Sequence, residues 1–234
     1  RYFRFREDIS IAAHVKTVSK FLEKDKLVDH DREGALHWVS RTDRAYTELL
    51  VTSWNLPLLL EKFCCALASE QINILSADVY TRKDNIACDI FQVCTLDHQP
   101  ITDSKVKKRV AEKITKLLSE DSYNPSQYLK LKKNYLRKDI SEGAIPFPVS
   151  VHTNNILSPT CTAIEIQALD RIGLLHDLFL EIGKLGLATV HARICTEKGA
   201  AMDTIYVSYP GGGKVEDREK LDEIEAALVK LVGF

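Results

Sequence analysis

An internal repeat constrains the fold of this chain more than any other feature of its sequence. The segment TELLVTSWNLPLLLEKFCCALASEQINILSADVYTRK, which begins at Thr47, aligns without gaps with TAIEIQALDRIGLLHDLFLEIGKLGLATVHARICTEK, which begins at Thr162. The offset is 115 residues, and few of the aligned positions are identical. The two segments share the order of their hydrophobic patterns, which survives divergence better than identity does. The chain is therefore expected to contain one small fold twice.

Each copy reads as a strand, a helix, a hairpin and a second helix. An alternating pattern predicts the first strand, and apolar residues at helical spacing predict the helix after it. Two strands separated by a turn signal then predict a hairpin, and an amphipathic helix follows. The predicted strands are 48–53, 72–80 and 86–94 in the first copy, and 163–168, 188–195 and 201–207 in the second.

The repeated order is βαββα, and one further strand would complete a ferredoxin-like βαββαβ unit. The segment PFPVSVHT, residues 146–153, is expected to supply that strand for the first copy. The second copy ends without an obvious final strand, so its sheet edge is expected to be short or filled by another segment, such as ALHWVSR at 35–41. The predicted fold class is α+β, with two ferredoxin-like domains in tandem.

A short helical segment is expected before the first domain. Residues 7–25 carry an apolar stripe at helical spacing, made of Ile11, Val15, Val18 and Leu22. The expected division of the chain is a helical lead-in over 1–40, a first domain over 46–155 and a second domain over 160–234. The first domain includes a basic insertion at 120–145, whose cluster of Lys and Arg is expected to be a solvated surface.

Charge and cysteine usage exclude several classes of function. The formal net charge is -1, which gives the chain no general attraction to nucleic acid. No apolar run reaches the length of a transmembrane helix, so no membrane contact is expected. The six cysteines include no C-x-x-C pair and are expected to be reduced thiols in a cytoplasmic protein. Because the sequence starts at Arg1, we expect a fragment of a longer protein.

The most informative short motif is LDRIGLL, residues 169–175, at the junction of the first strand and first helix of the second copy. Free N–H groups at a helix N-terminus attract anions. Gly173 has no Cβ, so a ligand can approach the backbone closely there. Asp170 can accept the ammonium group of an amino acid, or it can cap the helix. These residues leave both readings of Asp170 open.

The repeated βαββαβ order with DRIGLL at the first turn resembles the ACT domain family, whose usual form of this motif is D-R-P-G-L-L. Three other segments are similar to the C-terminal part of the bacterial bifunctional [protein-PII] uridylyltransferase/uridylyl-removing enzymes, which ends in a tandem ACT region. RYFRFREDISIAAHV at 1–15 resembles the segment just after their hydrolase domain, and INILSADVYTRKDNIACDIFQV at 72–93 and RICTEKGAAMDTIYV at 193–207 resemble their first and second ACT hairpins. The resemblance covers nearly the whole chain.

This resemblance implies a regulatory role in nitrogen assimilation. In that family, an upstream nucleotidyltransferase domain uridylylates the PII protein with UTP and a divalent metal such as Mg, and a second domain removes UMP. The ACT pair senses glutamine. The present chain carries neither catalytic domain, so it is expected to be non-catalytic and to need no cofactor of its own. Its implied partners are an amino acid, the upstream domains, the PII protein and a second ACT-bearing subunit in a dimer.

The resemblance also implies where a ligand would lie. In the family, ligands contact the first loop of one ACT domain and the second strand of the other, where an Asn often begins the strand. One complete site is expected, made of Asp170, Arg171, Ile172, Gly173 and Leu174 from the second copy with Asn73 from the first. The reciprocal site, Asn55 with Ala188, looks poorer, because Leu58 stands where the second copy has Gly173.

Other readings of the chain remain. The pair could be a docking module without a ligand, or the regulatory region of another amino-acid-controlled enzyme. An RNA-recognition motif shares the βαββαβ order, but its stacking aromatic pattern is missing here. His176 and Asp177 are adjacent, yet a helix position without further ligands argues against a metal site. PGGGK at 210–214 lacks the spacing of a phosphate-binding loop.

Overall fold

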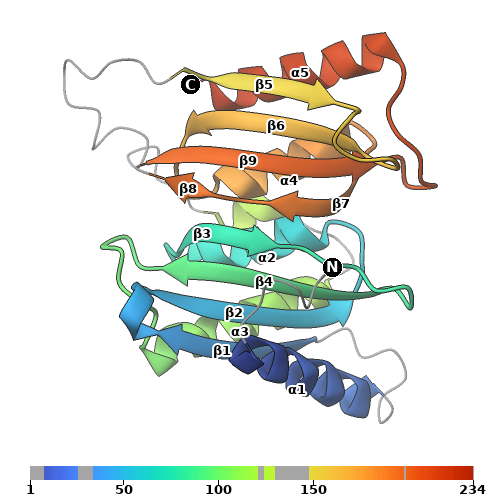
Figure 1. Cartoon of the computed structure of the whole chain (residues 1–234). Coiled ribbons are helices and arrows are strands. Elements are labelled where there is room, and N and C mark those ends of the chain that lie inside the picture. The colour runs from blue at the N-terminus through green and yellow to red at the C-terminus, as the bar shows by residue number, and fades with distance from the viewer. Residues whose placement is uncertain (1–7, 26–33, 121–123, 130–147, 198, 234) are drawn as a thin grey trace, which may run out of the picture.

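The computed structural model describes residues 8–25, 34–120, 124–129, 148–197 and 199–233. Within them one continuous nine-stranded sheet runs through the molecule (Figure 1). The strand order is β1-β2-β4-β3-β7-β9-β6-β5, with the short β8 paired to β9, and neighbouring strands are antiparallel. The first four strands come from the first copy of the repeat and the others from the second.

The two halves of the sheet have the same order of elements, apart from the two-residue strand β8 in the second. The first half is β1 (Ala35–Arg41), β2 (Tyr46–Trp54), α2 (Leu59–Ser69), β3 (Asn73–Asp78), β4 (Ile86–Cys94) and α3 (Ser104–Ser119). The second half is β5 (Ser150–Asn154), β6 (Thr162–Leu169), α4 (Leu174–Lys184), β7 (Ala188–Arg193), β8 (Thr196–Glu197), β9 (Ala200–Ser208) and α5 (Arg218–Val232). Within each half the sheet has the strand order of a ferredoxin-like unit, which agrees with the predicted tandem α+β fold.

The edge strands are arranged differently from the prediction. Residues 146–153 were expected to close the first copy, but β5 pairs with β6 of the second copy, so that prediction is wrong. ALHWVSR, considered as an edge for the second copy, is β1 and pairs with β2. Each edge strand therefore pairs with the strand that follows it in the chain, and the connection between the two is short, as antiparallel pairing allows. β1 begins at Ala35 and β5 at Ser150, so the 115-residue repeat includes both edges.

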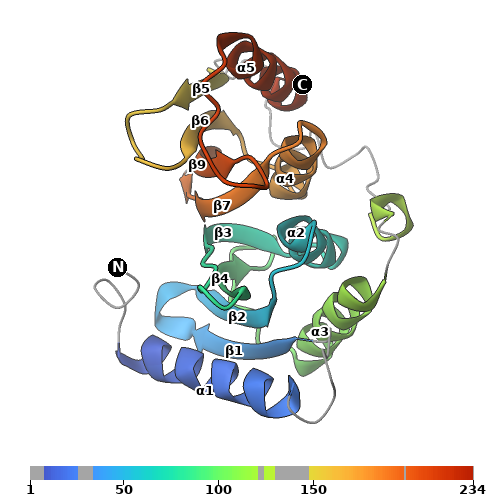
Figure 2. The same ribbon diagram turned by 90° about the vertical axis from the view of Figure 1, so that its right-hand side faces the viewer.

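Helices α2, α3, α4 and α5 cover one face of the sheet, whereas α1 (Asp8–Asp25) lies against the other face beside β1 and β2 (Figure 2). The predicted apolar stripe of α1 coincides only partly with the face that packs, because Leu22 packs beside Phe21 but Val15 is 57% exposed. His14, Thr17 and Phe21 are buried instead. Phe21 meets Trp54 edge to face, with 5.8 Å between the ring centroids, so one aromatic contact outweighs the aliphatic pattern.

The two units are joined in both layers. In the sheet, β3 pairs with β7 through Asp78 and Arg193, and the His191 ring Nδ1 lies 2.9 Å from the Val79 carbonyl oxygen. On the helical face, α2 packs against α4. A single apolar core contains buried residues from both units, including Phe63 of α2 and Phe179 of α4. The predicted intramolecular pairing of the two units is therefore confirmed. Among the described helices, none is long and apolar enough to cross a membrane.

Candidate functional site

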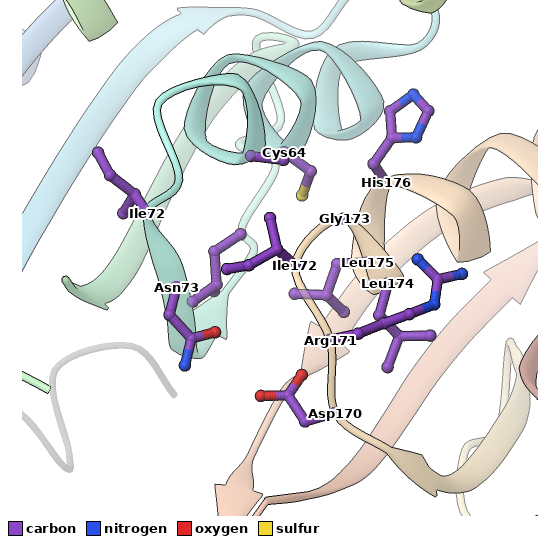
Figure 3. Close-up of a pocket in the computed structure, with 12 residues that line it drawn as sticks. Cys64, Ile72, Asn73, Asp170, Arg171, Ile172, Gly173, Leu174, Leu175 and His176 are labelled. Atoms are coloured by element: carbon purple, nitrogen blue, oxygen red, sulfur yellow. The ribbon is translucent and has the colours of Figure 1, made fainter. Parts of the chain in front are cut away.

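A hollow lies at the junction of the two units, between the loop before α4 and the start of β3 (Figure 3). It contains about 280 Å³ of empty space, counted together with the solvent at its opening. Residues 170–176 of the second unit form one wall, and α2 with residues 72–74 forms the other. The structure therefore brings together Asp170, Arg171, Ile172, Gly173, Leu174 and Asn73, which the sequence had grouped.

The loop that forms the first wall turns sharply before α4. The Asp170 N–H donates to the Gly199 carbonyl, and the Leu174 N–H donates to the Arg171 carbonyl. Gly173 has φ +84°, a left-handed conformation that favours glycine. Gly173, not Asp170, is the residue that precedes the first turn of α4, and no side chain caps the helix. The alternative that Asp170 is a helix cap is therefore wrong.

Asp170 presents a half-buried carboxyl group to the hollow (Figure 3). Burial raises its pKa above the ordinary value, although Thr196, Arg171 and His98 partly oppose that shift. Asn73 begins β3 of the other unit, and its amide extends toward the same side of the hollow as the Asp170 carboxyl group. The carboxyl group of Asp170 and the amide of Asn73, which come from different units, therefore lie on the same side of the hollow.

Arg171 is held by the helix that follows it. Its Nη2 lies 2.6 Å from Asp177 Oδ2, and Asp177 Oδ1 lies 2.9 Å from the His176 ring Nδ1. Burial raises the pKa of Asp177, but His176 and Arg171 outweigh burial and leave that pKa lowered. The adjacent His176 and Asp177 are therefore part of a clamp on the loop. The positive charge of Arg171 is already matched by a carboxylate.

The rest of the lining is mostly apolar. Ile72, Ile74, Ala68 and Cys64 come from the first unit, facing the leucines and Ile172 of the second. Burial raises the pKa of the Cys64 thiol well above its ordinary value, so this sulfur is a weakly polar wall rather than a nucleophile. Sequence reasoning missed Cys64 and Ala68, because only the packing of α2 against α4 brings them to the loop.

The reciprocal position in the first unit has the same backbone but a different side chain. Leu58 precedes α2 with φ +58°, at the repeat position of Gly173. Its Cδ2 atom lies 3.4 Å from where a Cβ on Gly183 of α4 would stand, so its side chain extends against the second unit. Asn55 is exposed and hydrogen-bonds to the turn at Asn85, with N to O 2.9 Å and Nδ2 to Oδ1 3.3 Å.

The other residue of the reciprocal site, Ala188, begins β7 and is half-buried opposite Ser208. Neither Asn55 nor Ala188 lines the hollow at Asp170. The predicted set of site residues therefore separates into six that share a hollow and two that lie elsewhere. In the reciprocal set, Asn55, Ala188 and Leu58 stand where the first site has Asp170, Asn73 and Gly173.

The hollow combines groups suited to holding a small zwitterion. A carboxylate accepts an ammonium group, the N–H groups of the first turn of α4 can receive a carboxylate, and the amide of Asn73 can donate and accept. Its apolar walls exclude water from these contacts. Among the described residues, no group of three His, Cys, Asp or Glu side chains could hold a metal ion.

The chain is similar in sequence to several bifunctional uridylyltransferase/uridylyl-removing enzymes. It is 32% identical over 190 residues to that of Rhodospirillum rubrum, and 29% identical over 191 residues to that of Bradyrhizobium diazoefficiens. A third relative, from Rhodopseudomonas palustris, is 29% identical over 189 residues. These matches cover 80–81% of this chain, and the chain spans about 20% of the length of these relatives.

No family model matches the chain. Among solved structures, aspartate kinase from Synechocystis superposes on 80% of this chain and on 27% of the kinase, with a TM-score of 0.43 and 12% sequence identity.

Proposed function

We propose that this chain is the tandem ACT region of a protein like the bifunctional uridylyltransferase/uridylyl-removing enzymes to which it is similar, and that the pair senses an amino acid, with glutamine as its ligand. The observation that carries the proposal is the shared hollow at the junction of the units. Asn73 of the first unit and Asp170 of the second both line it. A ligand there would contact both units at once, as a regulatory ligand must if it is to change their relative stability.

The proposed pose follows the charges of the hollow. The ligand ammonium lies at Asp170, and its α-carboxylate lies at the N–H groups that begin α4. The side-chain amide of glutamine then faces the amide of Asn73, where each amide can donate and accept one hydrogen bond. Glutamate would bring a second negative charge toward Asp170, while Arg171 is already paired with Asp177. The hollow should therefore prefer the neutral side chain.

The parent protein that this proposal implies is a cytoplasmic enzyme of nitrogen assimilation. Its upstream domains would add UMP to the PII protein with UTP and a divalent metal such as Mg, and would remove UMP again. Occupation of the ACT hollow by glutamine would shift the balance between the two activities. The metal is assigned to the upstream catalytic region, since this chain's described residues offer no cluster for it.

A second candidate function is a structural module that holds the catalytic domains without binding a ligand. Its support is the single core that spans both units and the Leu58 side chain that extends against α4 at the reciprocal position. A pair with a continuous core can transmit force between domains while empty. The two candidates differ in whether any amino acid binds.

Calorimetric titration of the chain with L-glutamine tests the proposal, with L-glutamate and L-alanine as comparison ligands. Saturable binding that is selective for glutamine is expected in the wild type, together with loss of that binding in Asp170→Ala. Unchanged binding in Asp170→Ala would place the ligand elsewhere. An absence of heat and of thermal stabilisation with every amino acid would favour the structural module.

A further inference from the structure

Two buried aspartates occupy the same place in the two copies of the repeat. Asp89 lies opposite Val51 across β2 and β4, and Asp203 lies opposite Ile166 across β6 and β9. Val51 and Ile166 are 115 residues apart, so the two carboxyl groups are repeat partners. Their residues are 1% and 2% exposed. Both face the core under the helices, where an acid is rare unless something specific holds it.

Each aspartate is satisfied at only one oxygen. The Tyr80 N–H donates to Asp89 Oδ1 over 3.1 Å, and the Cys195 N–H donates to Asp203 Oδ1 over 3.2 Å. The Oδ2 atoms of both residues are buried and have no hydrogen-bond partner among the described residues. A buried unpartnered carboxylate is costly, so each group is expected to be protonated near neutral pH in the absence of a cation.

The surroundings of the two acids differ in one respect that points to a ligand. Asp203 lies beside the backbone of Cys195, and the next residue, Thr196, hydrogen-bonds with Asp170. The charge of Asp170 raises the pKa of Asp203 further, beyond the larger effect of burial. At the first unit, the residue corresponding to Asp170 is the uncharged Asn55. Only the second unit therefore has an acid of the hollow coupled to a buried acid.

Among the residues that the structure describes, the only charge that acts on Asp203 is the negative charge of Asp170. From α2, the thiol of Cys64 lines the hollow and has its pKa raised by burial and also by Glu61, Asp89 and Asp203. From the loop before α4, the charge of Arg171 is paired with Asp177. His98 exerts only the weakest of the influences on Asp170. A cation delivered to the hollow would thus add to the influence of Arg171 on Asp170 and bring a positive charge toward Asp203.

We propose that Asp203, which lies behind the hollow rather than in its lining, is coupled to the ligand site, so that an ammonium-bearing ligand at Asp170 releases a proton from Asp203 to solvent when it binds. The inference rests on the proposed function, because it places an amino acid in the hollow. It adds that the site selects for a positively charged amino group and that its affinity depends on pH. Asp89, without an acidic neighbour at the loop, is the matched group that takes no part.

The sign of the pH dependence follows from the free protein. Burial raises the pKa of Asp203 to about 7, and a bound ammonium group lowers it again. Protons are therefore released on binding below about pH 7, and affinity rises with pH until Asp203 is already ionised in the free protein. A lowering by one pKa unit corresponds to about a tenfold gain in affinity over that range.

Titration calorimetry at pH 6 in two buffers of different ionisation enthalpy measures the released protons directly. The wild type and Asp89→Asn are expected to release a substantial fraction of a proton with L-glutamine. Asp203→Asn keeps the acceptor for the Cys195 N–H, so it should still bind glutamine but release at most half as much. Equal release in Asp203→Asn and the wild type, or none in the wild type, would overturn the inference while leaving glutamine binding intact.

A second measurement needs no ligand in its first step. Infrared spectra at pH 6 should contain a protonated carboxyl band that weakens in Asp203→Asn and, separately, in Asp89→Asn. Glutamine should remove only the part of this band that comes from Asp203, which is the part missing in Asp203→Asn. N-acetyl-L-glutamine, which has no ammonium group, should leave the band unchanged. A spectrum without any protonated carboxyl band would contradict the inference even if glutamine binds. Failure of glutamine to bind any variant would overturn the proposed function and this inference together.

Discussion

The two loops that precede α2 and α4 have the same backbone turn, but their side chains leave different amounts of space beside it. Leu58 and Gly173 both adopt left-handed φ angles, +58° and +84°, just before their helices. At Gly173 the missing side chain leaves a hollow lined by Asp170 and Asn73, while at Leu58 a side chain extends toward Gly183 of the other unit. This difference predicts that the loop before α4, and not the loop before α2, contributes to a ligand site.

Gly173→Leu should have the largest effect, because it gives the second loop the residue of the first. The side chain would fill the hollow, and the affinity for glutamine should fall by about a hundredfold or more, as when a pocket loses its volume. The strain should cost about 1–2 kcal/mol of stability. Calorimetry and thermal unfolding measure the two effects separately.

Gly186→Leu is the control for strain. Gly186 also has a left-handed φ of +78°, and a Cβ there would meet nothing within 4 Å. This variant should lose a similar amount of stability and keep its affinity. If both variants bind as weakly as each other, strain rather than filling of the hollow explains the loss, and the comparison between the loops fails.

Asp170→Asn should have the next largest effect. It converts the acid of the second loop to the amide found at Asn55 in the first, with little change in shape. Loss of a charge-assisted hydrogen bond costs about 1.5–3 kcal/mol, so glutamine affinity should fall between about tenfold and a hundredfold. Asn55→Asp, the reverse exchange in the other unit, should leave affinity within about twofold. Comparable losses in the two variants would mean that net charge, not the position of the acid, governs binding.

Asn73→Ala should have a smaller effect, since it removes a neutral hydrogen-bonding group at the edge of the hollow. A net contribution of about 1 kcal/mol predicts a loss of about fivefold in glutamine affinity. Ala188→Ser at the corresponding position of β7 should change affinity little. A competition titration measures such modest differences. An unchanged affinity for L-glutamine in Asn73→Ala would remove the first unit from the polar contacts of the site.

Much of the candidate site could be predicted from the sequence because the repeat aligns the loops and strands of both units. DRIGLL marked the second loop, and the Asn of QINI marked the facing strand. The pairing of a loop from one unit with a strand from the other came from the family resemblance. The contribution of α2, through Cys64 and Ala68, depends on how α2 and α4 cross, and no local pattern encodes that crossing.

The errors have physical reasons that the sequence does not state locally. The edge strands were assigned to the wrong halves. Each could have paired with a strand of either unit, and in the structure each pairs with the strand that follows it in the chain, because a short connection favours that neighbour. The packing face of α1 was misjudged in part, because buried His14 and Thr17 interrupt the apolar pattern. The paired aspartates could have been noticed in IACDIFQV and AMDTIYV. Asp89 stands four residues before Val93, which pairs with β2, and Asp203 stands four residues before Val207, which pairs with β6.

Leu58→Gly should produce the smallest change, and it tests whether space alone makes a site. The substitution removes the side chain that extends toward Gly183 and replaces a strained leucine with a residue that favours positive φ. Space without an acid or amide should not bind glutamine measurably, so one ligand per chain is expected. Adding Asn55→Asp and Ala188→Asn supplies both polar groups, and a second binding event, about tenfold weaker than the first, should then be seen by calorimetry. A second binding event with Leu58→Gly alone would show that the first unit lacks only the space for a ligand and does not need the polar groups to bind one. No second event in the triple variant would mean that the two units differ in more than these three side chains.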